Sequence, residues 1–524
     1  MAVTPVPVDG VVPYPVEFAE KYRSAGYWTG QTHTDMFAAT VARFPDRTAV
    51  ISGDREMTYA ELGDRVRRLA AGFLDRGLER GDRVVVHLPN IPEYLETVFA
   101  LWEIGAVPVF ALAAHTAREI SYFIEFSGAR GYITDTLPEG KLPSLDFCWT
   151  VNDSSFAGLA AGEPLVHAQR SNPADIAFLQ LSGGTTGLPK MIPRTHDDYL
   201  YSVRASNEIC DITQHTVQLV VLPISHNFTM SSPGVLGAVM AGATMVLAPD
   251  GMPETAFPLI EKHRVTQSQL VPPLALLWLN SPLKDGYDLS SLETLQVGGA
   301  KFSEEAACRV GPELGVTLQQ VFGMAEGLVN YTRLNDAPAT IAATQGLQMS
   351  PDDEVRVVDA ADNDVPAGTP GDLLIRGPYT IRGYFRAPEV NRRSFTEDGF
   401  YRTGDVVRMD ERGYLTVLGR SKDQINRGGE KISPEEVENL LLGHEGIHDV
   451  SVVGVPDDDL GERTRAYIIP REGVDPAGLG VLAVKRFLRD RGLAAFKIPD
   501  MIEFVDEFPQ TAVGKVSKRD QREE

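Results

Sequence analysis

The chain has 524 residues, 43% hydrophobic and 23% charged, which is typical of a soluble globular protein with more than one domain. Acidic residues outnumber basic ones by 72 to 49, and the formal charge of −23 argues against nucleic acid or a membrane as a partner. The three cysteines, Cys148, Cys210 and Cys308, form no CxxC pair, which argues against a cysteine metal site and fits a reducing, cytoplasmic location.

Neither of two candidate segments predicts export or insertion into a membrane. Residues 1–18 are rich in Pro and Val but lack the basic start and apolar core of a signal peptide. Residues 227–249 carry no charged residue over a length that could span a bilayer. Pro233 and three glycines interrupt this stretch, so we expect it to be buried core.

Helix and strand patterns alternate along the first four hundred or so residues. Residues 47–57 predict a hairpin around Gly53-Asp54, and Thr58 with Glu61 predicts a capping box that begins a helix. Pro92 predicts the start of another helix. Mostly apolar runs predict strands buried on both faces, at residues 84–88, 176–181, 218–222 and 244–247. This alternation predicts an α/β fold with largely parallel sheets.

The composition changes near Gly419, where residues 420–431 form a polar, glycine-containing run. Ser433, Pro434 and Glu436 then predict a second capping box. Strand, helix and strand patterns follow, at residues 450–455, 481–491 and 501–505. We therefore expect a large domain of residues 1–420 and a small α/β domain of residues 421–524.

The strongest local signal is Leu181-Ser-Gly-Gly-Thr-Thr-Gly-Leu-Pro-Lys190, which follows an apolar strand pattern. Glycines let backbone N–H groups approach a phosphate, and the hydroxyls and Lys190 add donors and charge. The segment is no Walker A loop, because Pro189 precedes the lysine and Met191 follows it. Taken alone, the segment fits an ordinary flexible turn better than a phosphate site.

Other segments follow in a fixed order, and together they favour a phosphate site over an ordinary flexible turn. Gln320-Val-Phe-Gly-Met-Ala-Glu326 predicts a strand, a tight glycine turn and then a carboxylate. Tyr401-Arg-Thr-Gly-Asp405 predicts an aspartate after another glycine turn, where it could accept both hydroxyls of a ribose. Between them lie Gly371-Asp-Leu-Leu-Ile-Arg-Gly377 and Arg382-Gly-Tyr384, and Pro509-Gln-Thr-Ala-Val-Gly-Lys515 places a lysine near the end.

In this order, the segments resemble the adenylate-forming superfamily of acyl-CoA synthetases, nonribosomal peptide synthetase adenylation domains and luciferases. The resemblance covers nearly the whole chain. It implies an α/β fold, with a large N-terminal domain of parallel-sheet subdomains and a small, mobile C-terminal domain. It also implies activation of a carboxylic acid by ATP and Mg²⁺.

The resemblance implies a role for each matching residue. Glu326 would help to hold Mg²⁺, Lys422 would be the hinge, and Lys515 would bridge the substrate carboxylate and the α-phosphate. Gly428 and Gly429 would line the entry channel of a thiol. ATP would be bound by Ser182, Gly183, Gly184, Thr185, Thr186, Gly187, Lys190, Gly298, Gly299, Val321, Phe322, Gly323, Met324, Asp405 and Arg420, with Phe322 stacking on adenine and Asp405 holding the ribose.

Residues 223–234, 297–301 and 323–331 resemble more specifically the stand-alone aryl acid–AMP ligases, above all the type that activates 2,3-dihydroxybenzoate. Residues 223–234 follow a predicted buried strand, where open α/β sheets bind ligands. The resemblance implies an acid pocket of Asn227, Phe228, Ser232, Gly299 and Val329, with Asn227 on the ortho hydroxyl and Ser232 and Val329 at the 3-position. We favour 2,3-dihydroxybenzoate, followed by salicylate. His226 either has a structural role or shields the reacting carboxylate in the catalytic site.

The predicted reaction has two steps, formation of an aryl-AMP with release of pyrophosphate and transfer of the aryl group to a thiol. The thiol would belong to the phosphopantetheine of a separate aryl carrier protein in siderophore or related nonribosomal peptide synthesis, or to coenzyme A. An aryl-CoA ligase and a non-catalytic nucleotide-binding protein of the same fold are the alternatives. Lys515, Glu326 and Asp405 are all present, which argues against the non-catalytic protein.

Overall fold

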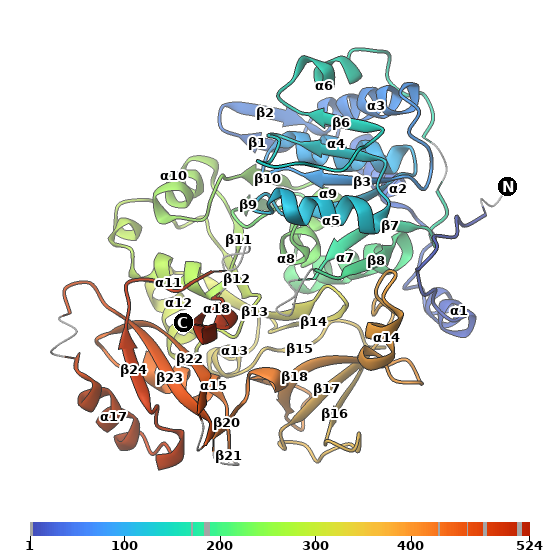
Figure 1. Ribbon diagram of the computed structural model, residues 1–524. Helices are drawn as coiled ribbons and strands as arrows, with labels where there is room; N and C mark the ends of the chain where they lie inside the picture. The colour runs from blue at the N-terminus through green and yellow to red at the C-terminus, as the bar shows by residue number, and fades with distance from the viewer. Residues whose placement is uncertain are drawn as a thin grey trace.

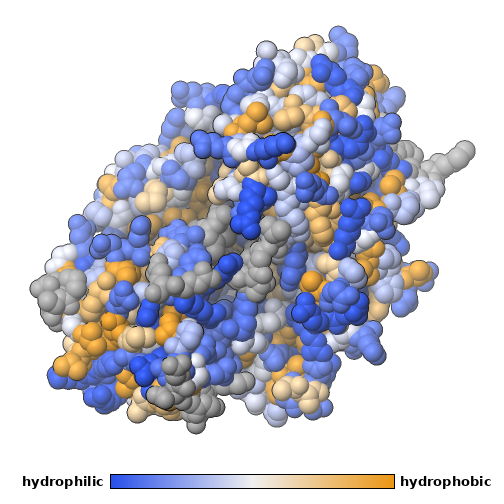
Figure 2. All heavy atoms as spheres, in the orientation of Figure 1, coloured by the Kyte–Doolittle hydropathy of each residue, from blue (hydrophilic) through white to orange (hydrophobic). Residues whose placement is uncertain are grey.

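The computed structural model describes residues 4–168, 171–182, 189–427, 430–457, 460–474, 479–510 and 516–523. Over these ranges the strands form four sheets, and helices cover the two largest (Figure 1). Three of the sheets lie in the large N-terminal part of the chain and the fourth lies in the small C-terminal part. Figure 2 shows hydrophilic residues over much of one face, as expected for a formal charge of −23.

The six-stranded sheet has the order β6-β5-β3-β4-β7-β8, and its strands are parallel except for the antiparallel edge strand β8. Its strands are β3 (Arg83–His87), β4 (Val107–Ala111), β5 (Gly131–Thr134), β6 (Phe147–Thr150), β7 (Ile176–Leu181) and β8 (Met191–Thr195). The central strands are almost entirely buried because helices pack against both faces.

The nine-stranded sheet has the order β15-β14-β13-β12-β11-β9-β10-β1-β2, with a parallel centre and antiparallel strands at both ends. Its strands are β1 (Thr48–Ser52), β2 (Arg55–Thr58), β9 (Val217–Val220), β10 (Thr244–Leu247), β11 (Gln267–Leu270), β12 (Thr294–Gly298), β13 (Thr317–Met324), β14 (Gly327–Tyr331) and β15 (Leu347–Gln348). The parallel centre brings the carboxyl ends of several strands to one edge, where ligands bind in such sheets.

The remaining sheet of the large domain is fully antiparallel and was not predicted from the sequence. It has the order β16-β17-β18-β19, made of β16 (Glu354–Val358), β17 (Gly371–Arg376), β18 (Tyr401–Met409) and β19 (Leu415–Arg420). Its apolar residues share a core with Ile192 of β8 and Leu328 of β14, so the three sheets of the large domain meet there.

The helices of the large domain follow the predicted alternation. They are α1 (Val16–Ser24), α2 (His33–Arg43), α3 (Tyr59–Asp75), α4 (Pro92–Glu103), α5 (Ala117–Ser127), α6 (Ser154–Leu159), α7 (His196–Cys210), α8 (Asn227–Ser231), α9 (Gly234–Ala241), α10 (Pro253–His263), α11 (Pro272–Asn280), α12 (Glu304–Leu314), α13 (Pro338–Ala343) and α14 (Pro388–Ser394). The capping box of Thr58 and Glu61 at the start of α3 is confirmed, as is the start of α4 at Pro92.

The small C-terminal domain has its own apolar core beneath a mostly antiparallel sheet. Its elements are β20 (Ile425–Arg427), β21 (Glu430–Ile432), α15 (Pro434–Leu442), β22 (Ile447–Asp457), β23 (Gly461–Pro470), α17 (Val481–Asp490), β24 (Met501–Phe504) and α18 (Lys518–Glu523). The separate core supports the expected second domain, whose boundary at residue 421 stays a prediction.

The predicted capping box at Ser433 is wrong, although α15 begins at Pro434 as expected. The Ser433 side chain makes no capping hydrogen bond, and its hydroxyl donates instead to the backbone oxygen of Leu418 at 2.7 Å. Glu436 pairs with Lys497 of the small domain. The contact of Ser433 with the last strand of the large domain therefore replaced the local cap.

Residues 227–249 form α8, α9 and β10 inside the large domain, as expected for buried core. Their apolar side chains belong to the two large core clusters. Among the described residues no helix is both long and apolar enough to cross a membrane.

Candidate active site

The predicted phosphate loop connects β7 and β8 as a hairpin loop rather than leading into a helix. Its two ends are joined by reciprocal hydrogen bonds, from Ser182 N–H to the Lys190 oxygen at 2.9 Å and from Lys190 N–H to Ser182 Oγ at 3.0 Å. Gly183, Gly184, Thr185, Thr186 and Gly187 lie outside the described residues. These hydrogen bonds hold the two ends of the loop together at the edge of the six-stranded sheet.

Glu326 lies at the two-residue turn between β13 and β14 and is 8% exposed. The expectation of a glycine turn at Gly323 is wrong, because Gly323 lies within β13 and the turn is formed by Ala325 and Glu326. Gly323 suits this position for a different reason, since a Cβ there would crowd the Leu328 backbone oxygen at 3.0 Å across the hairpin. The hairpin carries the carboxylate past the end of the sheet.

Lys190 and Glu326 meet at one tyrosine. The Tyr384 hydroxyl donates to Glu326 Oε1 at 2.7 Å and lies 2.9 Å from the Tyr401 hydroxyl. The ammonium of Lys190 lies over the Tyr384 ring, 4.7 Å from its centroid. The structure thus joins the phosphate loop, the Glu326 turn and the Tyr401–Asp405 segment through a residue to which the sequence had given no role.

Asp405 and Arg420 are direct partners across β18 and β19, which explains how residues 15 apart come together. Arg420 Nε lies 2.9 Å from Asp405 Oδ1. The predicted glycine turn before Asp405 is wrong, since Gly404 lies within β18, at a shift in its register with β17. Gly404 adopts a φ of 74°, which glycine tolerates best.

Within the described part of the chain, only one of the two carboxylate oxygens of Asp405 has a partner. The residue is 4% exposed, and Oδ2 is buried without a hydrogen bond among the described residues. Burial raises the pKa of the carboxyl, and Arg420 partly opposes the shift. A buried acceptor without a donor is costly, so a ligand hydroxyl at Oδ2 would stabilise the site.

The predicted adenine and acid segments share a wall. A Cβ on Gly298, at the end of β12, would lie 3.1 Å from Cζ of Phe228 and 2.7 Å from the Val321 oxygen. Gly298 therefore lets the Phe228 ring approach the end of β12, which pairs with β13 beside Phe322. Gly299 follows with a φ of 85°, which again favours glycine. Met324 and Phe322 are half-buried at the same end of β13.

The acid segment follows β9 and forms the short helix α8. His226 is its N-cap, and its Nδ1 accepts from the Phe228 N–H at 3.3 Å. This contact supports the structural alternative for His226 and does not test the catalytic one. Asn227 Oδ1 accepts from the Tyr199 hydroxyl at 2.9 Å, which leaves the amide N–H₂ group of Asn227 as the donor toward a ligand.

Two further residues that sequence reasoning missed hold this pocket. Gln269 in β11 is buried. Its side-chain amide donates to the backbone oxygens of Phe228 at 3.1 Å and Ser232 at 2.6 Å. The Tyr379 hydroxyl accepts from the Val329 N–H at 3.0 Å and donates to Asp353. A glutamine within a buried strand was a visible signal, because buried amides are almost always hydrogen-bonded.

The residues present fit a magnesium ion bound mainly by phosphates. Among the described residues no group of three His, Cys, Asp or Glu side chains could hold a metal. Mg²⁺ in nucleotide sites usually needs only one or two carboxylates beside phosphates and water. Glu326 can supply one, because Tyr384 uses Oε1 and no hydrogen bond within the described part of the chain uses Oε2.

Of the predicted small-domain site residues, Lys422 lies within the described part of the chain. Lys515, Gly428 and Gly429 lie outside the described residues. Lys422 lies in a short 3₁₀ turn (Ser421–Asp423) directly after β19. Burial lowers the pKa of its ammonium, with Arg420 and Lys190 adding smaller effects in the same direction. The predicted hinge is therefore next to the Asp405–Arg420 pair.

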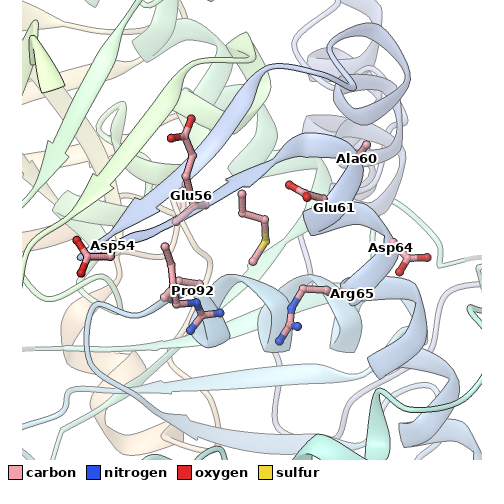
Figure 3. Close-up of a pocket in the computed structure, with 10 residues that line it drawn as sticks. Asp54, Glu56, Ala60, Glu61, Asp64, Arg65 and Pro92 are labelled. Atoms are coloured by element: carbon pink, nitrogen blue, oxygen red, sulfur yellow. The ribbon is translucent and has the colours of Figure 1, made fainter.

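A separate surface hollow of about 720 Å³ contains none of the predicted site residues. It lies over β2 and the starts of α3 and α4, and Figure 3 shows the carboxyl groups of Glu56, Glu61 and Asp64 spread apart. Its arginines already pair with neighbouring glutamates, Arg55 with Glu93 and Arg65 with Glu96. It offers no converging groups for chemistry.

The chain resembles known proteins along its whole length. Residues 37–385 match the AMP-binding enzyme family model and residues 436–515 match the AMP-binding enzyme C-terminal domain. A 2,3-dihydroxybenzoate-AMP ligase of Bacillus subtilis is 53% identical, over 98% of each chain. A salicyl-AMP ligase / salicyl-S-ArCP synthetase of Mycobacterium tuberculosis is 42% identical, over 98% of this chain and 94% of that protein.

A solved structure agrees with these sequence matches. The apo structure of MbtA from Mycobacterium smegmatis is 41% identical and covers 98% of this chain and 99% of its own, with a TM-score of 0.74. The order of the predicted segments, the two-domain α/β architecture and the family matches all agree. The chain belongs to the AMP-binding enzyme family.

Proposed function

We propose that this protein is an aryl acid–AMP ligase that activates a 2-hydroxyaryl carboxylic acid with ATP, 2,3-dihydroxybenzoate being favoured over salicylate. The product is the aryl-AMP, which then loads a phosphopantetheine thiol. The near full-length likeness to a 2,3-dihydroxybenzoate-AMP ligase supports this assignment.

The observation that carries the proposal is the wall shared by the two binding segments. Phe228 of the acid segment packs against Gly298, which pairs with Val321 in the neighbouring strand of the nucleotide segments. An acid lying on Phe228 would therefore have its carboxylate next to the nucleotide. Asn227 would donate its amide N–H₂ to the 2-hydroxyl oxygen, because Tyr199 already occupies the amide oxygen.

In the first step a carboxylate oxygen attacks the α-phosphorus, and the bond to the β-phosphate oxygen breaks to release pyrophosphate. Asp405 accepts hydrogen bonds from the ribose, and Lys190 faces the phosphates. Lys515 would lie between the carboxylate and the α-phosphate, where an ammonium would stabilise the negative charge that develops. The nucleophile needs no base, because a carboxylic acid is already ionised at neutral pH.

Glu326 would supply a carboxylate to the Mg²⁺ that accompanies ATP, and the ion would neutralise phosphate charge. In the second step a thiol attacks the aryl carbonyl, and AMP leaves. Rotation of residues 421–524 about Lys422 would exchange Lys515 for the loop of Gly428 and Gly429. A separate aryl carrier protein is the proposed thiol donor, and coenzyme A is the other thiol to test.

ATP–pyrophosphate exchange tests the first step directly. With Mg²⁺, we expect exchange with 2,3-dihydroxybenzoate and salicylate and little with benzoate or octanoate. Lys515→Ala should reduce the rate by about 10²–10³-fold, the usual cost of removing a group that stabilises developing charge. If octanoate or benzoate is the best substrate, the acid pocket is wrongly assigned. If Lys515→Ala exchanges at the wild-type rate, the lysine has no such role.

Ser232 should give only a modest preference for 2,3-dihydroxybenzoate over salicylate. Its side chain is buried beside the Tyr331 phenol, which can hydrogen-bond to it when no 3-hydroxyl is present. Since salicylate then leaves no buried group unpaired, we expect a preference of about tenfold or less in kcat/KM. Ser232→Ala should bring this ratio close to one. A wild-type preference above about a thousandfold would contradict the pairing with Tyr331.

A further inference from the structure

We infer that Tyr384 is a positioning residue for the binding of Mg·ATP, orienting Glu326 through its hydroxyl and Lys190 through its ring. This inference rests on the proposed function, in which Glu326 serves the metal and Lys190 serves the phosphates. Tyr384 itself need not touch the substrate.

The hydroxyl of Tyr384 fixes one of the two oxygens of Glu326. It donates its single proton to Oε1 at 2.7 Å, so its contact with Tyr401 at 2.9 Å must use the Tyr401 proton. The order of donors is therefore Tyr401 to Tyr384 to Glu326. A carboxylate held at Oε1 cannot rotate freely, and Oε2 keeps a constant direction in which to bind a metal.

The ring of Tyr384 acts on Lys190. A cation within about 6 Å of an aromatic centroid is attracted to the ring face, and Lys190 Nζ lies at 4.7 Å. The ring therefore holds the ammonium at the end of the phosphate loop, close to the carboxylate that would bind the metal. Tyr384 thus positions both the Lys190 ammonium and the Glu326 carboxylate, which come from different sheets. In the proposed function the first binds the phosphates and the second binds Mg²⁺.

The two functions can be separated by two substitutions. Tyr384→Phe removes the hydroxyl and keeps the ring, so it should weaken binding of Mg·ATP by about tenfold and leave binding of metal-free ATP unchanged. Tyr384→Leu removes both groups and should weaken both. Calorimetric titration with ATP, in saturating Mg²⁺ and in EDTA, measures the two affinities. Tyr467→Phe, a buried small-domain tyrosine that donates to the Gln521 oxygen, is the matched control and should change neither.

A double-mutant cycle tests whether Tyr384 acts through Glu326. In a Glu326→Gln background, Tyr384→Phe should have no further effect on Mg·ATP affinity. Equal weakening of Mg·ATP and metal-free ATP by Tyr384→Phe, or a full additional effect in that background, would overturn the inference. If Glu326→Gln leaves the Mg²⁺ dependence unchanged, the metal role of Glu326 fails as well. If Glu326→Gln abolishes that dependence and Tyr384→Phe has no effect, the inference alone fails.

Discussion

Replacing Arg194 by methionine should lower the free energy of unfolding by about 3–5 kcal/mol, the usual cost of breaking a buried ion pair. Arg194 and Asp198 are 2% and 1% exposed, with Nε 2.9 Å from Oδ1. The same guanidinium donates to the oxygens of Ala325 at 2.8 Å and Tyr379 at 3.1 Å. The variant would leave a buried carboxylate without its cation and two carbonyls without their donor.

The loss in free energy of unfolding caused by Arg194→Met should become smaller as the pH is lowered. Burial already raises the pKa of Asp198, and Arg194 opposes that shift, so its removal raises the pKa further. A folded state whose carboxyl pKa exceeds that of the unfolded state binds the extra proton, so stability falls as pH rises. Denaturant unfolding at about pH 5 and about pH 8 measures this slope.

A matched control distinguishes burial from pairing as such. Arg68→Met breaks another Arg–Asp pair four residues apart, with Asp64 at 2.7 Å, whose side chains are 33% and 43% exposed. We expect it to cost less than about 1 kcal/mol, because exposed pairs contribute little. A similar small cost for Arg194→Met would show that the buried pair does not stabilise the fold.

Replacing Asp405 by alanine should raise the KM for ATP by roughly a hundredfold, since two hydrogen bonds to a charged acceptor contribute about 3 kcal/mol. Oδ2 is buried without a partner, and Oδ1 is oriented by Arg420. The fold should survive, because the Arg420 side chain is 50% exposed and water can solvate it. Pyrophosphate exchange at varied ATP concentration gives the value.

Deoxynucleotides test whether the higher KM for ATP in Asp405→Ala comes from lost contacts with the ribose. Wild type should bind 2′-deoxy-ATP and 3′-deoxy-ATP more weakly than ATP, whereas Asp405→Ala should not distinguish the three. Asp364→Ala, which removes an exposed carboxylate paired with Arg356 in the same part of the fold, should behave as wild type. If Asp405→Ala still prefers ATP over both deoxynucleotides as strongly as wild type does, Asp405 does not bind the ribose.

Local elements were predicted well because their signals are local. The strands Ile176–Leu181 and Thr244–Leu247 have the bounds that their apolar runs predict. Thr58 and Glu61 form their capping box because both partners lie within one helical turn. Ser433 has the same local pattern, but the Leu418 oxygen competes for its hydroxyl. A tertiary partner can thus override a cap that the sequence favours.

The glycine turns at Gly323 and Gly404 were wrong for a related reason. Glycine permits a turn, a bulge or a close approach, and the neighbouring strands decide which one forms. At Gly323 a side chain would crowd the backbone of the facing strand, and at Gly404 the pairing with β17 shifts register. The sequence marks such positions without showing which partner needs them.

The sequence by itself determined the family-level chemistry of this protein, because the ordered segments around Lys190, Glu326, Asp405 and Lys515 carry their residue types in plain view. Tertiary structure alone decided what supports them. Tyr384 reaches Glu326 across 58 positions, Tyr199 reaches Asn227 across 28, and Arg194 reaches Tyr379 across 185. Contacts of this length depend on how three sheets pack, which no spacing along the chain encodes.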